Sequence, residues 1–229
     1  MPNWVYNSLT IEDTPDVVNV IKEQLNKPFS YIHDTWDNET KDFGKKETFY
    51  SAPVFAFWNI IKPDNLEEYH TTSDGTQLAN PLNWYNWNNA HWGTKWDVAR
   101  ADGREYDDTE LQDEVENGDN LVLVYRFNTA WSPPIPALLE LSRQYPKTLL
   151  NLEWEEEQGF GGEVEFLHGD IISQFDYESK CMDCGLVDCL EYCDTCEANI
   201  CNSCHDMSEV DDTIASECDE HKQYVGVNA

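Results

Sequence analysis

Basic residues are scarce in this chain. Its 229 residues include 14 Lys and Arg against 45 Asp and Glu, which gives a formal net charge of −31 and a sequence pI near 4.2. Affinity for DNA and RNA comes largely from basic side chains that displace counterions from phosphates. The composition therefore argues against direct nucleic-acid binding and favours a protein partner, with a basic one expected.

Long apolar runs and an export signal are also missing. No stretch approaches the roughly 18 apolar residues of a membrane-spanning helix. The first residues carry neither a basic start nor an apolar run. We therefore expect a soluble cytoplasmic protein that does not contact a membrane; for a viral protein this is the host cytoplasm. A packed core is still expected, because the chain is 40% hydrophobic and 13% aromatic.

Familiar catalytic motifs are absent as well, since neither GxSxG nor HExxH occurs. His168, Asp170 and Ser173 include the residue types of a hydrolase, but such co-occurrence is common and we interpret them as a loop. The glycines at 159–162 lack the Lys-Ser/Thr of a phosphate-binding loop and indicate a turn. We expect a non-enzymatic protein; an enzyme with a Trp-rich pocket is the alternative.

The spacing of apolar residues predicts an α+β domain over residues 1–177, with a mainly antiparallel sheet and helices on one face. Residues 34–50 are expected to be irregular, and the acidic residues 102–119 are expected to form a solvated helix or loop. Strands are predicted at 4–11, 53–61, 120–129, 150–155 and 164–167, and helices over 15–25, 80–93 and 132–145. The predicted core includes Trp4, Leu9, Val18, Ile21, Phe57, Leu123, Tyr125, Leu138 and Leu152.

Several aromatic motifs carry a resemblance to a known family. They are Pro2-Asn3-Trp4 with Asn7 and Leu9, Trp84-Tyr85-x-Trp87 with the run from Asn89 to Asp97, and the run from Phe127 through Trp131 to Pro136. Over residues 1–175 the chain resembles the YubB-type ferredoxin-like family of bacteriophages and plasmids. The resemblance implies a ferredoxin-like (split βαβ) topology in a mobile-element protein. It carries over no catalytic residue.

The Trp-rich segment is a candidate binding surface. Aromatic residues at helical spacing more often belong to a core, so we favour the core interpretation over the surface. The candidate surface residues are Trp84, Trp87, His91, Trp92, Lys95 and Trp96.

Every Cys lies in the acidic segment 178–229, which we interpret as a small zinc-binding module. A Cys-x2-Cys pair points two sulfurs at one ion, and four consecutive pairs supply two tetrahedral sets. We therefore expect two zinc ions. The predicted ligands are Cys181, Cys184, Cys193, Cys196, Cys201, Cys204, Cys218 and His221, with Cys189 and His205 as possible substitutes.

The order of ligand pairs resembles B-box, ZZ and FYVE-like cross-brace fingers. That resemblance implies that the first and third pairs share one ion and the second and fourth share the other. Sequential pairing is the alternative. Thiolate-rich sets are closed and structural rather than catalytic, and no Lys or Arg lies between Cys181 and His221. The module is thus expected to contact protein rather than nucleic acid.

These observations lead to a hypothesis of function. The chain is interpreted as a non-enzymatic zinc-binding interaction protein of a bacteriophage or mobile element that binds a host or phage protein. The alternative within the binding class is an acidic DNA mimic, whose carboxylates occupy the basic groove of a nucleic-acid-binding enzyme.

Overall fold

The computed structural model describes residues 3–37, 39, 41–69, 80–104 and 109–178, and the backbone of 191–193 and 198–200. Side chains at 33–37, 42 and 43 lie outside this description. The chain divides into two compact units, Met1–Glu157 with Gly162–Phe175, and Gln158–Gly161 with Asp176–Ala229. The first unit contains most of the main sheet.

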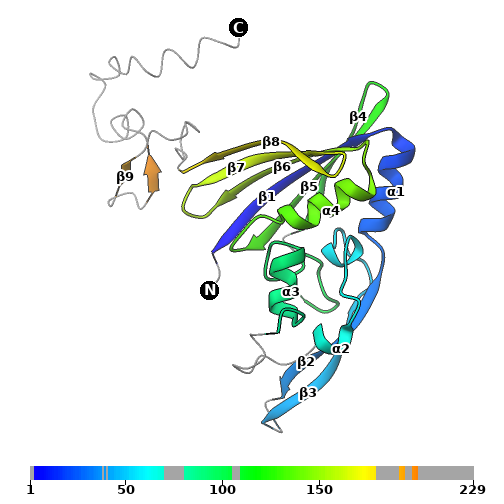
Figure 1. The fold of residues 1–229 in the computed structure, drawn as a ribbon, viewed down its shortest axis with the longest axis vertical. Helices are drawn as coiled ribbons and strands as arrows, with labels where there is room; N and C mark the ends of the chain where they lie inside the picture. Colours follow the sequence, from blue (N-terminus) through cyan, green and yellow to red (C-terminus); the bar gives the residue numbers. More distant parts are fainter. Residues whose placement is uncertain are drawn as a thin grey trace. The chain divides into compact units, whose positions relative to one another are not determined.

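The main sheet has six strands in the order β4-β5-β1-β6-β7-β8 (Figure 1). The central strand β1 is antiparallel to both β5 and β6, and β4 is antiparallel to β5. The strands are β1 Trp4–Asp13, β4 Glu110–Asn117, β5 Asn120–Ala130, β6 Leu149–Glu156, β7 Gly161–Leu167 and β8 Asp170–Tyr177.

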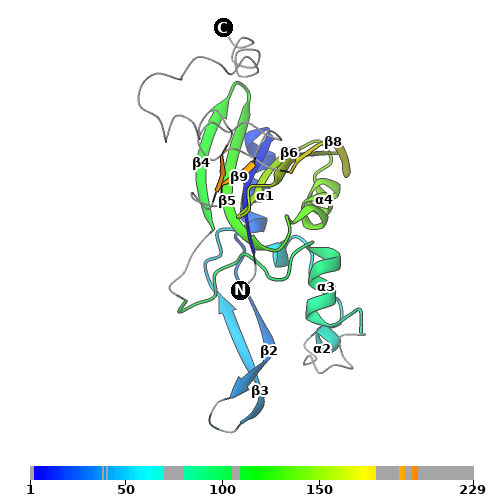
Figure 2. The ribbon, with the colours of Figure 1, turned by 90° about the vertical axis from the view of Figure 1, so that its left-hand side faces the viewer.

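Two helices cover one face of this sheet. Helix α1 (Pro15–Leu25) contacts β1 and β5, and α4 (Ile135–Gln144) contacts β6; Figure 2 shows the sheet turned by 90°. Each helix begins with proline in its first turn, where the missing N–H costs no hydrogen bond. The order β1-α1-β4-β5-α4-β6 is that of a ferredoxin-like domain. The predicted ferredoxin-like fold, with a mainly antiparallel sheet and helices on one face, is confirmed.

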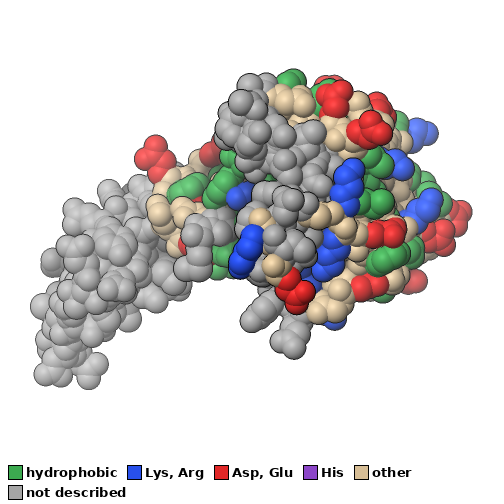
Figure 3. All heavy atoms as spheres, turned by 90° about the horizontal axis from the view of Figure 1, so that it is seen from below, with side chains coloured by type: hydrophobic (Ala, Val, Ile, Leu, Met, Phe, Trp, Pro, Cys, Tyr) green, Lys and Arg blue, Asp and Glu red, His purple; other side chains and the backbone are tan. Residues whose placement is uncertain are grey.

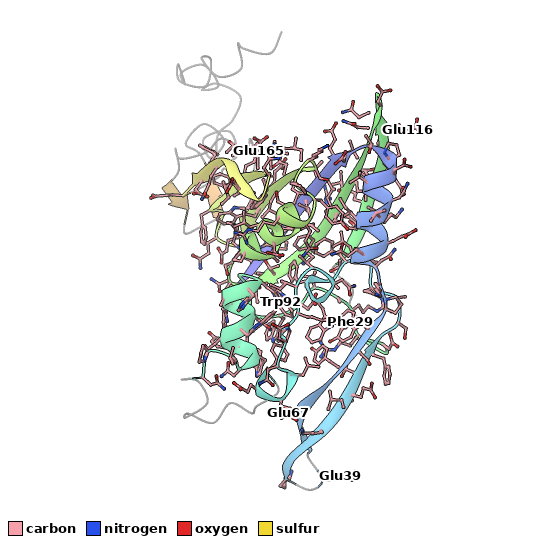
Figure 4. All side chains as sticks on the ribbon, turned by 45° about the vertical axis from the view of Figure 1, so that its right-hand side comes forward. Phe29, Glu39, Glu67, Trp92, Glu116 and Glu165 are labelled. Atoms are coloured by element: carbon pink, nitrogen blue, oxygen red, sulfur yellow. The ribbon has the colours of Figure 1, made fainter. Side chains whose placement is uncertain are left out.

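An insertion of residues 26–109 separates α1 from β4. It begins with a two-stranded hairpin, and short helices follow (Figure 1). Figure 4 labels Glu39 at the far end of this hairpin and Glu116 at the far end of the β4–β5 hairpin. The elements of the insertion are β2 Phe29–Asp37, β3 Asp42–Tyr50, the 3₁₀ helix η1 Phe57–Asn59, α2 Leu66–Tyr69 and α3 Trp84–His91.

One core joins the insertion to the sheet. Phe55 stacks on Phe127 of β5, with ring centroids 5.1 Å apart, and Phe57 meets the same ring edge-on at 5.9 Å. The predicted core residues are all fully buried except Trp4, which is half-buried on the opposite face of the sheet. None of the helices within the described ranges is both long and apolar enough to cross a membrane.

Two predictions within the insertion are wrong. Residues 34–50 are not irregular, since β2 and β3 pair from Phe29↔Tyr50 to Asp37↔Asp42. The apolar run 53–61 is buried but is not a strand. The Asp97 carboxylate accepts hydrogen bonds from the N–H groups of Phe57 (2.9 Å) and Trp58 (2.8 Å), and these bonds stabilise a 3₁₀ turn instead.

Two further corrections concern the sheet edges. Part of the acidic segment 102–119 forms β4, an exposed edge strand rather than a helix or loop. The loop predicted around His168 is a two-residue turn, and β8 follows it at the opposite edge. Charged side chains are common on edge strands, because they discourage pairing with other chains.

Candidate binding surface

The face of the sheet opposite α1 and α4 is the first component of the site, and we call it the open face. Residues directly opposite in an antiparallel pair share a face. Ser8 of β1 lies opposite Arg126 of β5 and Glu153 of β6, and Tyr6 lies opposite Asn128 and Glu155. Tyr6 is 50% exposed. The open face therefore presents polar and aromatic side chains to solvent.

Carboxylates dominate the open face. Glu163 of β7 accepts a hydrogen bond from the Asn151 amide at 2.8 Å, which places it beside β6. Glu12 accepts amide hydrogen bonds from Asn117 (3.1 Å) and Asn120 (3.0 Å). Among the described residues of these strands, Arg126 is the one cation on this face. The register and burial pattern assign to it Glu12, Glu110, Asp113, Glu153, Glu155, Glu163 and Glu165, the last labelled in Figure 4.

The second component is a group of aromatic rings around a lysine, which we call the Lys95 cluster: Trp4, Tyr85, Lys95, Trp96 and Trp131. The Lys95 ammonium lies 4.4 Å from the centroid of Trp96 and 4.7 Å from that of Trp131. Both indoles are well exposed, at 41% and 44%. Trp4, at the start of β1, packs 6.3 Å from Trp96 and so joins the cluster to the open face.

Hydrogen bonds anchor the backbone that carries the Lys95 cluster. The Thr94 hydroxyl donates to the carbonyl of Ala130 at 3.0 Å and accepts from its N–H at 3.1 Å. The Asn88 amide donates to the Lys95 carbonyl at 2.8 Å. The Gly93 carbonyl accepts from the Ser132 hydroxyl. The segment 93–97 is therefore fixed to the ends of β5 and α3, which preorganises the side chains that it presents.

Trp131 has an unusual backbone conformation. Its φ of +74° lies in the left-handed region, which is uncommon for a bulky residue. Its N–H donates to the Asn3 carbonyl at 2.9 Å, which extends the pairing of β1 with β5 by one residue. Such conformations concentrate at functional sites, where strain is tolerated in order to place a side chain. The indole of Trp131 is thus presented to solvent at an energetic cost.

The predicted Trp surface is divided by the structure. Trp87 and Trp92 belong to the core, and Figure 4 labels Trp92 next to α3. His91 stacks on Trp87 with ring centroids 4.3 Å apart, and Trp84 is half-buried. Only Lys95 and Trp96 of the predicted set lie in the Lys95 cluster. Sequence analysis missed Trp4, Tyr85 and Trp131 as its partners, although all three fall in the aromatic motifs.

Charge is unevenly distributed along the chain. Eight of its 14 basic residues fall in the insertion, at Lys27, Lys41, Lys45, Lys46, Lys62, Lys95, Arg100 and Arg104. Figure 3, a view from below Figure 1, shows Lys and Arg side chains grouped at the end of the unit where the insertion lies. The open face is consequently more acidic than the insertion beside it.

The partly buried Tyr31 and the buried Tyr50 and Tyr69 form a further polar cluster in the insertion. The hydroxyls of Tyr31 and Tyr50 are 3.3 Å apart, and the Tyr69 hydroxyl donates to Asn88 Oδ1 at 2.9 Å. Burial raises the pKa of each of these hydroxyls. The phenols stay protonated at neutral pH, so they contribute packing and hydrogen bonds rather than proton transfer.

Most predicted zinc ligands lie outside the described residues, namely Cys181, Cys184, Cys189, Cys196, Cys201, Cys204, His205, Cys218 and His221. The backbone of Cys193 is described, at the end of strand β9 (Glu191–Cys193), which pairs with β10 (Ala198–Ile200). Within the described part of the chain, no three His, Cys, Asp or Glu side chains form a group that could hold a metal ion.

Comparison with known proteins supports the fold. Residues 106–193 match the family described as "Ferredoxin-like domain in Api92-like protein", which agrees with the ferredoxin-like order of strands and helices in the structure. The match begins just before β4, the second strand of the domain, and leaves out β1, α1 and all but the end of the insertion.

One solved structure is similar to the chain, the crystal structure of the protein Api92 from Yersinia pseudotuberculosis. It has 10% sequence identity and a TM-score of 0.49, covering 78% of this chain and 99% of that chain. No curated protein matches the chain.

Proposed function

We propose that the chain is a non-enzymatic interaction protein that binds a basic protein through the open face of its sheet. The observation that carries this proposal is the open face itself, on which carboxylates from β1, β4, β6 and β7 outnumber the one cation of the described strands, Arg126. A net charge of −31 steers a basic partner toward the protein. In a mobile-element setting, which the YubB-type resemblance implies, the partner is a host or phage protein.

The test is a binding measurement on an identified partner. Host-lysate capture identifies candidates, and each purified candidate is titrated against the full chain at about 0.1 M salt. Glu153→Gln with Glu163→Gln neutralises two exposed carboxylates of the open face. Glu23→Gln with Glu67→Gln makes the same charge change in α1 and α2. We expect about tenfold weaker binding for the first pair and less than twofold for the second. Equal effects would contradict a defined binding face.

A DNA mimic is the second candidate, because several carboxylates share the open face. They do not form a regular array, since β1 contributes only Glu12, β5 contributes none, and a bulge lies between Glu110 and Asp113 of β4. We therefore keep as the first choice an interaction protein that leaves the partner's nucleic acid in place, which we call the adaptor. Competition separates the two candidates: a short DNA duplex displaces a mimic fully from its target, whereas an adaptor and the duplex bind together.

The proposal includes a structural role for zinc in residues 178–229. The ligand pairs Cys193/Cys196 and Cys201/Cys204 flank β10 in sequence, and the interleaved and sequential pairings both assign these two pairs to separate ions. Closed thiolate sites of this kind hold a small module folded.

A further inference from the structure

We infer that the Lys95 cluster is a cage for an arginine side chain of the basic partner, and that Lys95 is the occupant of this cage in the unbound protein. The inference rests on the proposed function, because it names the chemical group through which the basic partner engages the surface. It assigns to the exposed rings a role that the carboxylates of the open face do not supply.

The geometry of Lys95 shows that two indole faces converge on one cation. Cation–π attraction operates within about 6 Å of a ring centroid, and the ammonium satisfies this limit for both Trp96 (4.4 Å) and Trp131 (4.7 Å). The two indoles come from segments about 35 residues apart, and the hydrogen bonds of Thr94 to Ala130 hold those segments together. The cage is therefore a built feature rather than a chance contact between neighbours in sequence.

Lys95 is held weakly enough to exchange. Among the described residues, no carboxylate lies within ion-pair distance of its ammonium, although the chain has 45 acidic residues. Lys95 is half-buried, and among the ionic and ring contacts of the described residues it is held by cation–π contacts alone; such contacts near the surface are weak. A partner side chain with a stronger affinity for indole faces can therefore displace it.

A guanidinium is the occupant that this chemistry prefers. It is planar, stacks on aromatic rings, and is less strongly hydrated than an ammonium. Trp4 extends the aromatic surface toward the open face, where Glu155 lies opposite Tyr6 in the register. The negative potential of that face favours a cation entering the cage and disfavours the phosphates of single-stranded nucleic acid, the other ligand that stacks on such rings.

The conformation of Trp131 is a second, independent observation. A left-handed φ of +74° is unfavourable for a residue with a Cβ, and the hydrogen bond from the Trp131 N–H to the Asn3 carbonyl holds it in place. The indole remains 44% exposed in this conformation, so part of its ring is available to a ligand.

The test uses the full chain and two labelled heptapeptides, one of arginine and one of lysine, with fluorescence anisotropy at low salt. Lys95→Arg keeps the charge but places a stronger occupant in the cage, so it should weaken arginine-peptide binding about threefold. Lys95→Ala empties the cage and should strengthen arginine-peptide binding about threefold relative to Lys62→Ala. The Lys62→Ala control removes an exposed lysine of the same charge elsewhere. Trp131→Leu should abolish the preference for arginine over lysine.

The results of these binding measurements distinguish failure of the cage from failure of the proposed function. Equal affinity for both peptides, with no effect of Lys95→Arg, overturns the cage. If Glu153→Gln with Glu163→Gln still weakens both peptides in that case, the open face stands as the binding surface. If neither peptide binds, both proposals fail. Binding of an oligothymidylate that Trp96→Leu abolishes would show that the cluster is a base-stacking site and would also overturn the cage.

Discussion

The hydroxyl of Thr94 exchanges two hydrogen bonds with the backbone of Ala130, one as donor and one as acceptor. Thr94 is fully buried, and Ala130 is the residue of β5 that pairs with Trp4 of β1. The Thr94 side chain therefore links the insertion directly to the last residue pair of β1 and β5. This link also restricts the neighbouring residues Lys95 and Trp96. The Lys95 cluster therefore has a defined geometry, although its residues come from separate segments of the chain.

Gly93→Ala should destabilise the first unit by roughly 2–3 kcal/mol. A Cβ at this position would lie 2.4 Å from Pro136 Cδ and 3.1 Å from the Pro133 carbonyl, and φ is already +81°. Gly118→Ala is the control, because its φ is also positive but nothing lies within 4 Å of the added Cβ. It should cost only about 1 kcal/mol. Urea denaturation checks both values, and equal costs would contradict the close approach.

Trp131→Gly should be more stable than Trp131→Ala by about 0.5–1 kcal/mol. Both variants lose the indole, but only alanine keeps the strain of a left-handed φ, and the greater freedom of glycine in the unfolded chain offsets part of the gain. Thermal denaturation of the two variants, side by side, provides the measurement. An alanine variant that equals or exceeds the glycine variant would show that this backbone relaxes.

Asp97→Asn should change how stability depends on pH. Burial raises the pKa of the Asp97 carboxyl, while the N–H groups of Trp58 and Phe57 oppose the shift. The folded state therefore holds the proton more tightly than the unfolded chain. The contribution of Asp97 to stability is largest below its ordinary pKa of 3.8 and is lost as pH rises through the folded value. The unfolding free energy of wild type minus that of the variant should decrease as pH rises above 3.8; a constant difference would contradict the shift.

Truncation after Tyr177 should leave a protein that unfolds cooperatively. The core consists of residues from β1, α1, the insertion, β5, α4, β6 and β7, all of which the truncation keeps. Domains of about 150 residues bury enough surface to fold alone. Circular dichroism during heating checks this, and a soluble truncated chain without a thermal transition would show that residues 178–229 complete the core.

Purified protein should contain about two zinc ions per chain. Cys181→Ser and Cys204→Ser should each lose one ion if the pairing is interleaved or sequential, whereas Cys189→Ser should keep both. Chelation should unfold residues 181–221 alone, because metal binding supplies most of the folding energy of such modules, about 10–16 kcal/mol in zinc-finger peptides. Metal analysis with less than one ion, or disulfides in mass spectrometry, would contradict this prediction.

The elements predicted correctly from sequence have one buried side and one solvated side. In β5, Leu121, Leu123, Tyr125 and Phe127 are buried and alternate with more accessible residues, so the period of two is visible. In β4 that alternation is lost, because an edge strand exposes nearly every side chain, including Glu110, Glu114 and Glu116. The charge content of β4 is then like that of a loop, and the strand can be recognised only by its pairing with β5.

Long-range contacts explain the remaining misses. The run 53–61 is as apolar as a strand, but a carboxylate about 40 residues away, that of Asp97, binds its N–H groups and closes a 3₁₀ turn. The Lys95 cluster needs Trp4 and Trp131, which lie far from Lys95 in sequence and meet it only when the sheet has formed. Local periodicity contains no signal for either arrangement.

The register of β1 has a consequence for the speed of folding. Trp4 pairs with Ala130 and Val5 with Glu156, and even the pair Asp13↔Leu121 joins residues 121 − 13 = 108 positions apart, so the central strand closes long chain loops on both sides. The β4–β5 hairpin, in contrast, closes across a tight turn between Asn117 and Asn120. Rates of folding fall as contacts become more distant in sequence. We expect the β4–β5 hairpin to form early and β1 to join the sheet last. Both edges of the central strand β1 should therefore stay unpaired until the C-terminal half of the chain has been synthesised.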